Sequence, residues 1–289
     1  MTSSSAVADA FARVRLAGFT GRATKLSDLD LPRIGHTIGV GEDEIHAVIE
    51  VEASGGGFDA LGRPKMLFEP HVFYRNLTGS ARAQAVQAGL AYASWKPGSY
   101  PKDSYPRLKS AMAISETAAL KAASWGLGQI LGENYVAAGY ESPQQMVLAF
   151  VEGGESEHLA AMMRFIVDKR LDDELRAHNW AGFARGYNGS AYAQHGYHTK
   201  LAAAYAKWRK IKDTPWSPDQ DAVGKPVPVP PVTIDFIPPP SAGPAFAPAA
   251  RNPSSPPALA PAPPQTVAPA PRQSFGAWLS SLLSRPWFG

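Results

Sequence analysis

The sequence EDEIHAVIEVEASGGG, residues 42–57, has the pattern of a helix that ends at a run of glycines. Its first three residues are acidic, and the helix dipole favours negative charge in the first turn of a helix. Apolar residues then recur at helical spacing, and three consecutive glycines close the stretch. The stretch therefore predicts a helix from about residue 42 to residue 53, followed by a turn.

Glu52 is the unusual residue of this helix. Ile45, Val48 and Ile49 form an apolar stripe, and Glu52 falls on the same face, whereas Glu50 falls on the opposite one. A carboxyl on an apolar face loses solvation, so its pKa rises and the group can hold a proton at neutral pH. A glycosidase needs such an acid to protonate the leaving oxygen. The sequence therefore predicts Glu52 as a general acid.

Two questions about carboxylates stay open at this level. Glu52 could instead form a structural ion pair with Arg63 or Arg75. Glu69 ends a predicted short strand, residues 65–69, and is the candidate for a second catalytic carboxylate that stabilises the transition state or activates water. The alternative is that Glu69 pairs with Arg63 and fixes a hairpin.

The rest of the folded region is mostly helical. Helices are predicted to start at Ser27 and to cover residues 80–92, 105–124, 143–152, 156–169, 172–179, 180–187 and 194–212. No alternation of strands and helices is present. The sequence therefore predicts an α+β fold that is predominantly α-helical, with a small β-hairpin after the helix that carries Glu52.

Composition divides the chain into a folded domain and a long tail. Of the 27 prolines, 19 lie at positions 215–271, in a stretch that is rich in alanine and poor in charge. Such a stretch cannot bury enough apolar surface to fold. The sequence predicts a flexible lead over residues 1–22, a catalytic domain over 23–212, a disordered Pro/Ala-rich linker over 213–273 and an amphipathic helix over 274–289. That last helix suits a membrane surface or a protein groove, or it has no role.

Charge and residue content exclude several other classes of protein. The net charge of +3 is too small to indicate nucleic-acid binding, and the absence of cysteine excludes disulfides. His195 and His198 lie three apart, but no HExxH motif accompanies them, so we predict neither a metal nor a cofactor. The chain has no signal-peptide pattern and no apolar run of roughly 18 residues. We expect a soluble monomer.

Three motifs, the first in two parts, follow one another along the chain. They are VEASGGGF (51–58) with GRPKMLFEPH (62–71), ASWGLGQILGENY (123–135) and WAGFARGYNG (180–189). In this order they resemble the motifs of the N-acetylmuramidase family of phage endolysins and secreted bacterial effectors. The resemblance extends over about residues 24–208.

The resemblance implies a lysozyme-like fold in which Glu52 is the catalytic acid and the G-L-x-Q segment lines the sugar cleft. Amide groups and aromatic faces suit sugar hydroxyls and rings, and glycines let a polymer pass close to the backbone. The candidate substrate contacts are Ser54, Gly57, Gln129, Tyr187 and Asn188.

The predicted function is a peptidoglycan hydrolase that cleaves the β-1,4 bond between N-acetylmuramic acid and N-acetylglucosamine. We expect it to be made in a host bacterial cytoplasm and to act on the cell wall in the periplasm, as a phage endolysin does; a bacterial effector is the alternative role. Two other activities stay open, a lytic transglycosylase and a wall-binding module whose catalytic centre has decayed. Ala53 and Pro70, which depart from the family pattern, keep the last one open.

Overall fold

The structure is a computed structural model that describes residues 4–53, 55–96 and 99–221. All of these residues belong to one compact unit of the chain. The helix predicted at the C-terminus and most of the predicted linker lie outside the described residues.

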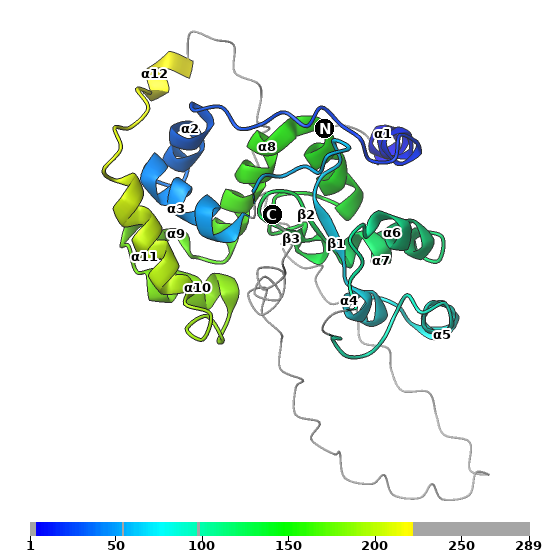
Figure 1. Ribbon diagram of the computed structural model, residues 1–289. Coiled ribbons are helices and arrows are strands. Elements are labelled where there is room, and N and C mark those ends of the chain that lie inside the picture. Colours follow the sequence, from blue (N-terminus) through cyan, green and yellow to red (C-terminus); the bar gives the residue numbers. More distant parts are fainter. Residues whose placement is uncertain (1–3, 54, 97–98, 222–289) are drawn as a thin grey trace, which may run out of the picture. The chain divides into compact units, whose positions relative to one another are not determined.

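The described part of the chain is mostly helical and has a small antiparallel sheet (Figure 1), which confirms the predicted fold class. Its helices are α1 (Ser4–Leu16), α2 (Asp30–His36), α3 (Glu42–Glu52), α4 (Pro70–Arg75), α5 (Gly79–Gln87), α6 (Tyr105–Met112), α7 (Glu116–Lys121), η1 (Gly132–Asn134), α8 (Pro143–Asp168), α9 (Asp172–Arg176), α10 (Trp180–Asn188), α11 (Tyr197–Trp208) and α12 (Pro218–Asp221). Its strands are β1 (Met66–Phe68), β2 (Ala123–Trp125) and β3 (Ile130–Leu131).

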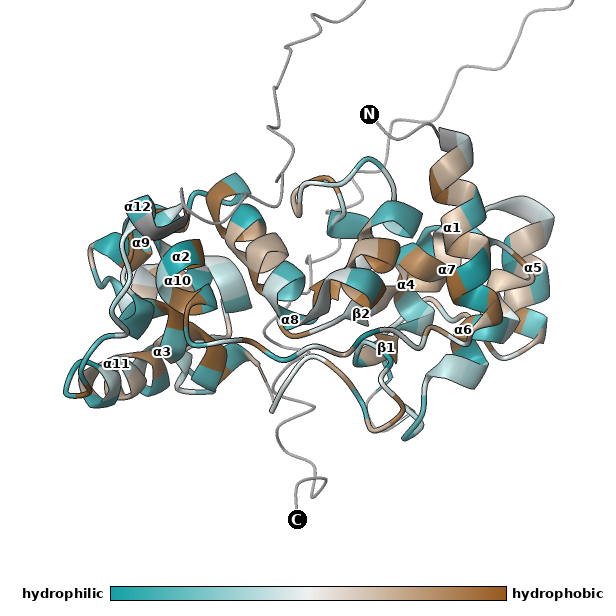
Figure 2. Cartoon of the chain, turned by 90° about the horizontal axis from the view of Figure 1, so that it is seen from above, coloured by the Kyte–Doolittle hydropathy of each residue, from teal (hydrophilic) through white to brown (hydrophobic). Residues whose placement is uncertain are grey.

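Helix α8 lies between two groups of helices. Figures 1 and 2 show α2, α3, α9, α10 and α11 on one side of it and α1 with α4 to α7 on the other. Met146, Phe150, Leu159 and Met162 of α8 are completely or almost completely buried. Because burial of apolar surface is the main stabilising contribution to folding, α8 unites the cores of the two groups.

A kink interrupts α8 at Gly154, whose φ of 72° is in the left-handed region. The sequence predicts two helices, 143–152 and 156–169, and these correspond to the two halves of α8. A side chain at position 154 would lie 2.9 Å from the carbonyl oxygen of Thr24. Glycine is therefore required both by the backbone conformation and by this close approach.

The sheet differs from the predicted hairpin. Directly after α3, a single bridge joins Phe58 to Pro64, and β1 pairs with the distant strand β2, so that Met66 lies opposite Trp125. The helix predicted over residues 105–124 is two helices, α6 and α7, and its last residues belong to β2 instead. Strand β2 has only three residues and is buried throughout, so it is too short to show the sustained alternation of polar and apolar residues that identifies a strand.

Both predicted ends of the catalytic domain need correction. The sequence predicts a flexible lead over residues 1–22, but α1 packs on α8 and buries Phe11 and Val14. The predicted linker begins at residue 213, but the backbone N–H of Thr214 donates to Glu42, and Trp216 packs edge-on against His36 at 5.3 Å. Within the described residues, no helix is both long and apolar enough to cross a membrane.

Candidate active site

Glu52 is the last residue of α3 and is completely buried. Its Oε2 accepts a hydrogen bond of 2.9 Å from the side-chain amide of Asn188, the last residue of α10. Its Oε1 has no hydrogen-bond partner among the described residues. The two helices thus hold one carboxylate oxygen and leave the other unbonded.

Burial raises the pKa of Glu52 to about 8, since a carboxylate loses its hydration inside the protein. The hydrogen bond from Asn188 and the positive charge of Lys200 act in the opposite direction and are weaker. Glu52 is therefore protonated at neutral pH, as a general acid must be.

The predicted orientation of α3 is confirmed. Glu50 is exposed and accepts hydrogen bonds from Lys207 and from the indole N–H of Trp208. The alternative of a structural ion pair for Glu52 is wrong, because Arg63 pairs with Asp59 and with Asp103. The other proposed partner, the guanidinium of Arg75, pairs with Glu133.

Tyr187 precedes Asn188 and is also buried. Its ring stacks on Phe183 at 5.4 Å and meets Phe165 edge-on at 5.9 Å. Burial raises the pKa of Tyr187 well above its ordinary value, and the charge of Glu52 contributes in the same direction. The structure thus brings Glu52, Tyr187 and Asn188 of the first and last sequence motifs together.

The other candidate contacts lie in turns. Ser54 is outside the described residues. Gly57 is buried, and its N–H donates to Glu155 at 2.6 Å. Gln129 has a φ of 47°, and its side-chain amide donates to the carbonyl oxygens of Gly126 at 2.7 Å and Lys65 at 3.2 Å. Its amide nitrogen therefore ties the turn between β2 and β3 to the start of β1.

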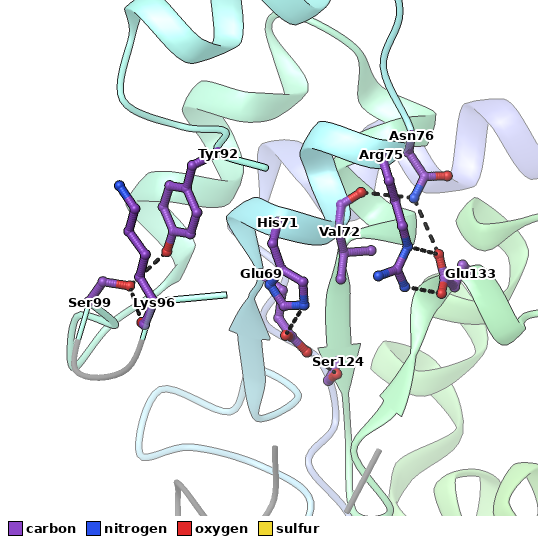
Figure 3. Close-up of polar contacts among 10 residues, drawn as sticks. All are labelled: Glu69, His71, Val72, Arg75, Asn76, Tyr92, Lys96, Ser99, Ser124 and Glu133. Carbon is purple, nitrogen blue, oxygen red and sulfur yellow. Dashed lines mark hydrogen bonds and ion pairs between the residues drawn. The ribbon is translucent and has the colours of Figure 1, made fainter. Parts of the chain in front are cut away.

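Glu69 lies in a different environment, at the junction of β1 and α4 (Figure 3). Its carboxyl is 3.5 Å from the hydroxyl of Ser124 and 3.6 Å from Nε2 of His71. Burial raises the pKa of Glu69 to about 8 and lowers that of His71 to about 4. Among the described residues, its hydrogen bonds and ion pairs do not include Glu52. The predicted pair of Glu69 with Arg63 is also absent from these contacts.

Glu155 and His158, which follow the kink in α8, are absent from the sequence-based candidates although both are buried. Each forms hydrogen bonds with a motif segment, Glu155 with Gly57 and His158 with Leu127. The one sequence signal is that four polar residues, positions 155–158, follow Gly153-Gly154 within a largely apolar helix. Their role is visible only once these distant segments are in contact.

The histidine pair His195 and His198 has no metal-binding arrangement around it. Within the described ranges, no three His, Cys, Asp or Glu side chains gather closely enough to hold a metal ion. Nε2 of His178, in another part of the chain, is 2.6 Å from Glu44, and the His178 ring packs on Tyr205 at 4.3 Å.

Comparisons with known proteins identify the family of the chain. Residues 42–209 match the family model described as Muramidase: N-acetylmuramidase. Among solved structures, the chain is similar to the crystal structure of the Burkholderia AP3 phage endolysin, with 37% sequence identity and a TM-score of 0.60. The similarity covers 68% of this chain and 76% of the endolysin chain. A comparison with curated proteins gave no match.

Proposed function

This chain belongs to the N-acetylmuramidase family of glycoside hydrolases, and we propose that Glu52 is the acid with which it cleaves the β-1,4 bond between N-acetylmuramic acid and N-acetylglucosamine in peptidoglycan. The observation that carries the proposal is the environment of Glu52: a buried carboxyl with a pKa of about 8, bonded through Oε2 to Asn188. Such a group holds the proton that the leaving sugar needs.

In the proposed step, protonated Glu52 donates its proton through Oε1 to the glycosidic oxygen. The bond between this oxygen and C1 of the muramic acid breaks, and positive charge develops at C1 and the ring oxygen. Asn188 keeps Oε2 fixed and favours the carboxylate that forms. Since Glu52 is fully buried, the glycan must displace neighbouring atoms before Oε1 reaches the bond.

Glu69 takes no direct part in this step. At neutral pH its raised pKa keeps it protonated, and a protonated carboxyl neither stabilises a cation by its charge nor accepts a proton from water. Its contacts with Ser124 and His71 support a role in the packing of the sheet instead.

A lytic transglycosylase is the second candidate, because the groups that shift the pKa of Glu52 in the described residues, Asn188 and Lys200, include no second carboxyl. The 6-hydroxyl of the muramic acid would then attack C1 in place of water and leave an anhydro end. Mass spectrometry of the muropeptides released from purified peptidoglycan distinguishes the two. Hydrated reducing ends indicate the muramidase, and anhydro ends the transglycosylase.

The test of the acid is Glu52→Gln, which keeps the shape of the side chain and removes its titratable proton. It should release muropeptides roughly 10²- to 10⁴-fold more slowly than the wild type while still binding the wall. Release at the wild-type rate would show the assignment to be wrong. Normal wall binding by a wild-type chain that releases nothing would instead indicate a decayed, wall-binding module.

The biological role that fits best is that of a phage endolysin acting on the wall from the periplasm, in line with the 37% identity to an endolysin; a bacterial effector is the alternative. Residues beyond 221 would aid delivery to the wall. Because Thr214 and Trp216 contact the domain, a truncation should end after residue 221. The truncated chain should digest soluble wall fragments at the normal rate and whole cells more slowly, whereas equal rates on whole cells would contradict a role in delivery.

A further inference from the structure

The first turn of α8 after its kink joins segments that are far apart in the sequence. Oε1 of Glu155 accepts a hydrogen bond of 2.6 Å from the N–H of Gly57 and one of 2.9 Å from Lys25. Its Oε2 accepts a third, of 3.2 Å, from the N–H of Leu26. Burial alone would raise the pKa of Glu155, but these three donors outweigh it and hold the pKa below its ordinary value. Glu155 is thus a buried, ionised anchor for the glycine loop (residues 55–57) that follows Glu52.

His158 binds a second segment in the same way. Its Nε2 lies 3.0 Å from the carbonyl oxygen of Phe150, which can only accept, so Nε2 carries the proton. Its Nδ1 is then free to accept the 3.2 Å hydrogen bond from the N–H of Leu127. Burial lowers the pKa of His158 to about 4, which keeps the ring neutral and this arrangement intact at physiological pH. His158 therefore anchors the turn over residues 126–129, which carries Gln129.

The same imidazole explains two glycines of the sequence motifs. A Cβ at position 57 would lie 2.4 Å from Nδ1 of His158, and one at position 126 would lie 2.9 Å from the same ring. The ring also stacks on Phe58 at 4.8 Å. The glycine loop and the turn thus both contact this one imidazole, and both need glycine where they touch it.

We propose that Glu155 and His158 are positioning residues of the active site, which hold the glycine loop behind Glu52 and the turn of Gln129 in fixed relation to each other. The inference rests on the proposed role of Glu52 as the acid, because the glycine loop directly follows Glu52 and matters to catalysis only if Glu52 is the acid. Neither residue needs to touch the glycan. They act through Gly57 and Leu127, whose backbone amides they bind.

The first test is Glu155→Gln. A glutamine keeps the size of the side chain, but its amide nitrogen cannot accept from a backbone N–H, so Gly57 or Leu26 loses its acceptor. We expect kcat to fall roughly 10- to 100-fold, the scale of an ångström-sized misplacement in an active site, with a much smaller change in KM. A loosened loop also admits water to Glu52, so the loss of activity at alkaline pH should begin at lower pH than in the wild type.

His158 offers a matched pair of variants that lose the same ring. In His158→Asn, the side-chain oxygen takes the place of Nδ1 and can still accept from Leu127, whereas in His158→Gln, the terminal amide takes the place of Nε2 and preserves only the bond to Phe150. If His158 positions the turn through Leu127, kcat should be clearly higher for His158→Asn than for His158→Gln, at similar melting temperatures. Equal kcat values would overturn the role of the Leu127 bond.

The control is Glu157→Gln, on the same turn of α8. Glu157 is partly exposed and binds Arg164 and Tyr140, away from both segments. It should lose stability with little change in kcat. Glu155→Gln is measured under conditions in which it is fully folded. The positioning proposal is wrong if this variant keeps the wild-type kcat and the wild-type loss of activity at alkaline pH. It is also wrong if Glu157→Gln lowers kcat as much as Glu155→Gln does. Failure of the acid assignment is a separate result, because it appears as activity at the wild-type rate in Glu52→Gln.

Discussion

Two glutamates that the sequence singles out, Glu52 and Glu69, are alike in their burial and differ in their neighbours. Both are buried, and burial raises the pKa of each to about 8. Glu52 ends a helix, is bonded to an amide from another helix and precedes three glycines. Glu69 precedes a short helix beside the sheet, next to a neutral imidazole and a hydroxyl.

A raised pKa does not by itself identify a catalytic acid. Desolvation acts on any buried carboxyl, whatever its purpose. The neighbours separate the two residues: Tyr187 and Asn188, from the last sequence motif, adjoin Glu52, whereas Ser124 and His71 adjoin Glu69. Each prediction below applies the same change to both environments.

The largest expected difference is in the rate of peptidoglycan cleavage. Glu52→Gln should lower kcat by roughly 10²- to 10⁴-fold, the usual contribution of a general acid. Glu69→Gln should lower it by less than about tenfold, which is about 1.4 kcal/mol in the barrier. Turbidity assays on purified walls measure both. A loss in Glu69→Gln as large as in Glu52→Gln would restore Glu69 as a second catalytic carboxyl.

Stability should change alike for the two residues. Between pH 4.5, the ordinary glutamate value, and about 8, the folded chain keeps a proton that the unfolded chain releases, so stability falls as pH rises. Each glutamate contributes up to roughly 1.4 kcal/mol per pH unit. Glu52→Gln and Glu69→Gln should therefore each gain stability over the wild type at pH 7.5 and much less at pH 5. Urea unfolding at both pH values tests this, and a gain that is independent of pH would argue against buried, protonated carboxyls.

Removing the hydrogen-bond partner of each glutamate should have a smaller effect on kcat, and the effect should differ between the two sites. Asn188→Ala removes the amide that orients Glu52, and we expect kcat to fall about tenfold, the scale of one buried hydrogen bond. Ser124→Ala removes the hydroxyl beside Glu69 and should leave kcat unchanged. Circular dichroism melting curves verify that both variants are folded. Equal effects on kcat would remove the distinction between the two sites.

The smallest effect is an expected absence of change. Activity should decline as pH rises through about 8, because Glu52 must be protonated to act. In Glu69→Gln this decline should occur at the same pH as in the wild type, although Glu69 has a similar pKa. The pH dependence of kcat decides the matter, and a shifted decline would show that the titration of Glu69 affects the reaction.

Local sequence patterns were sufficient to predict many of the helices and the orientation of Glu52. The apolar stripe of α3 separated Glu52 from Glu50, and the two helices over residues 143–152 and 156–169 were visible because each has helical periodicity. The pattern failed for β2, which is short and buried on all sides. It also failed for α1, since composition does not reveal that this helix packs on α8 or that Phe11 and Val14 are buried.

The sequence alone determined the fold class, the inward orientation of Glu52 and the order of the motifs, because these depend on periodicity and on residues that are neighbours in the chain. Only the tertiary structure decided which residues meet. It joined Asn188 to Glu52, placed Glu69 beside Ser124, and brought Glu155 to Gly57 and His158 to Leu127. Such contacts depend on how α8 and the helices around it pack, and residues about a hundred positions apart carry no local record of that packing.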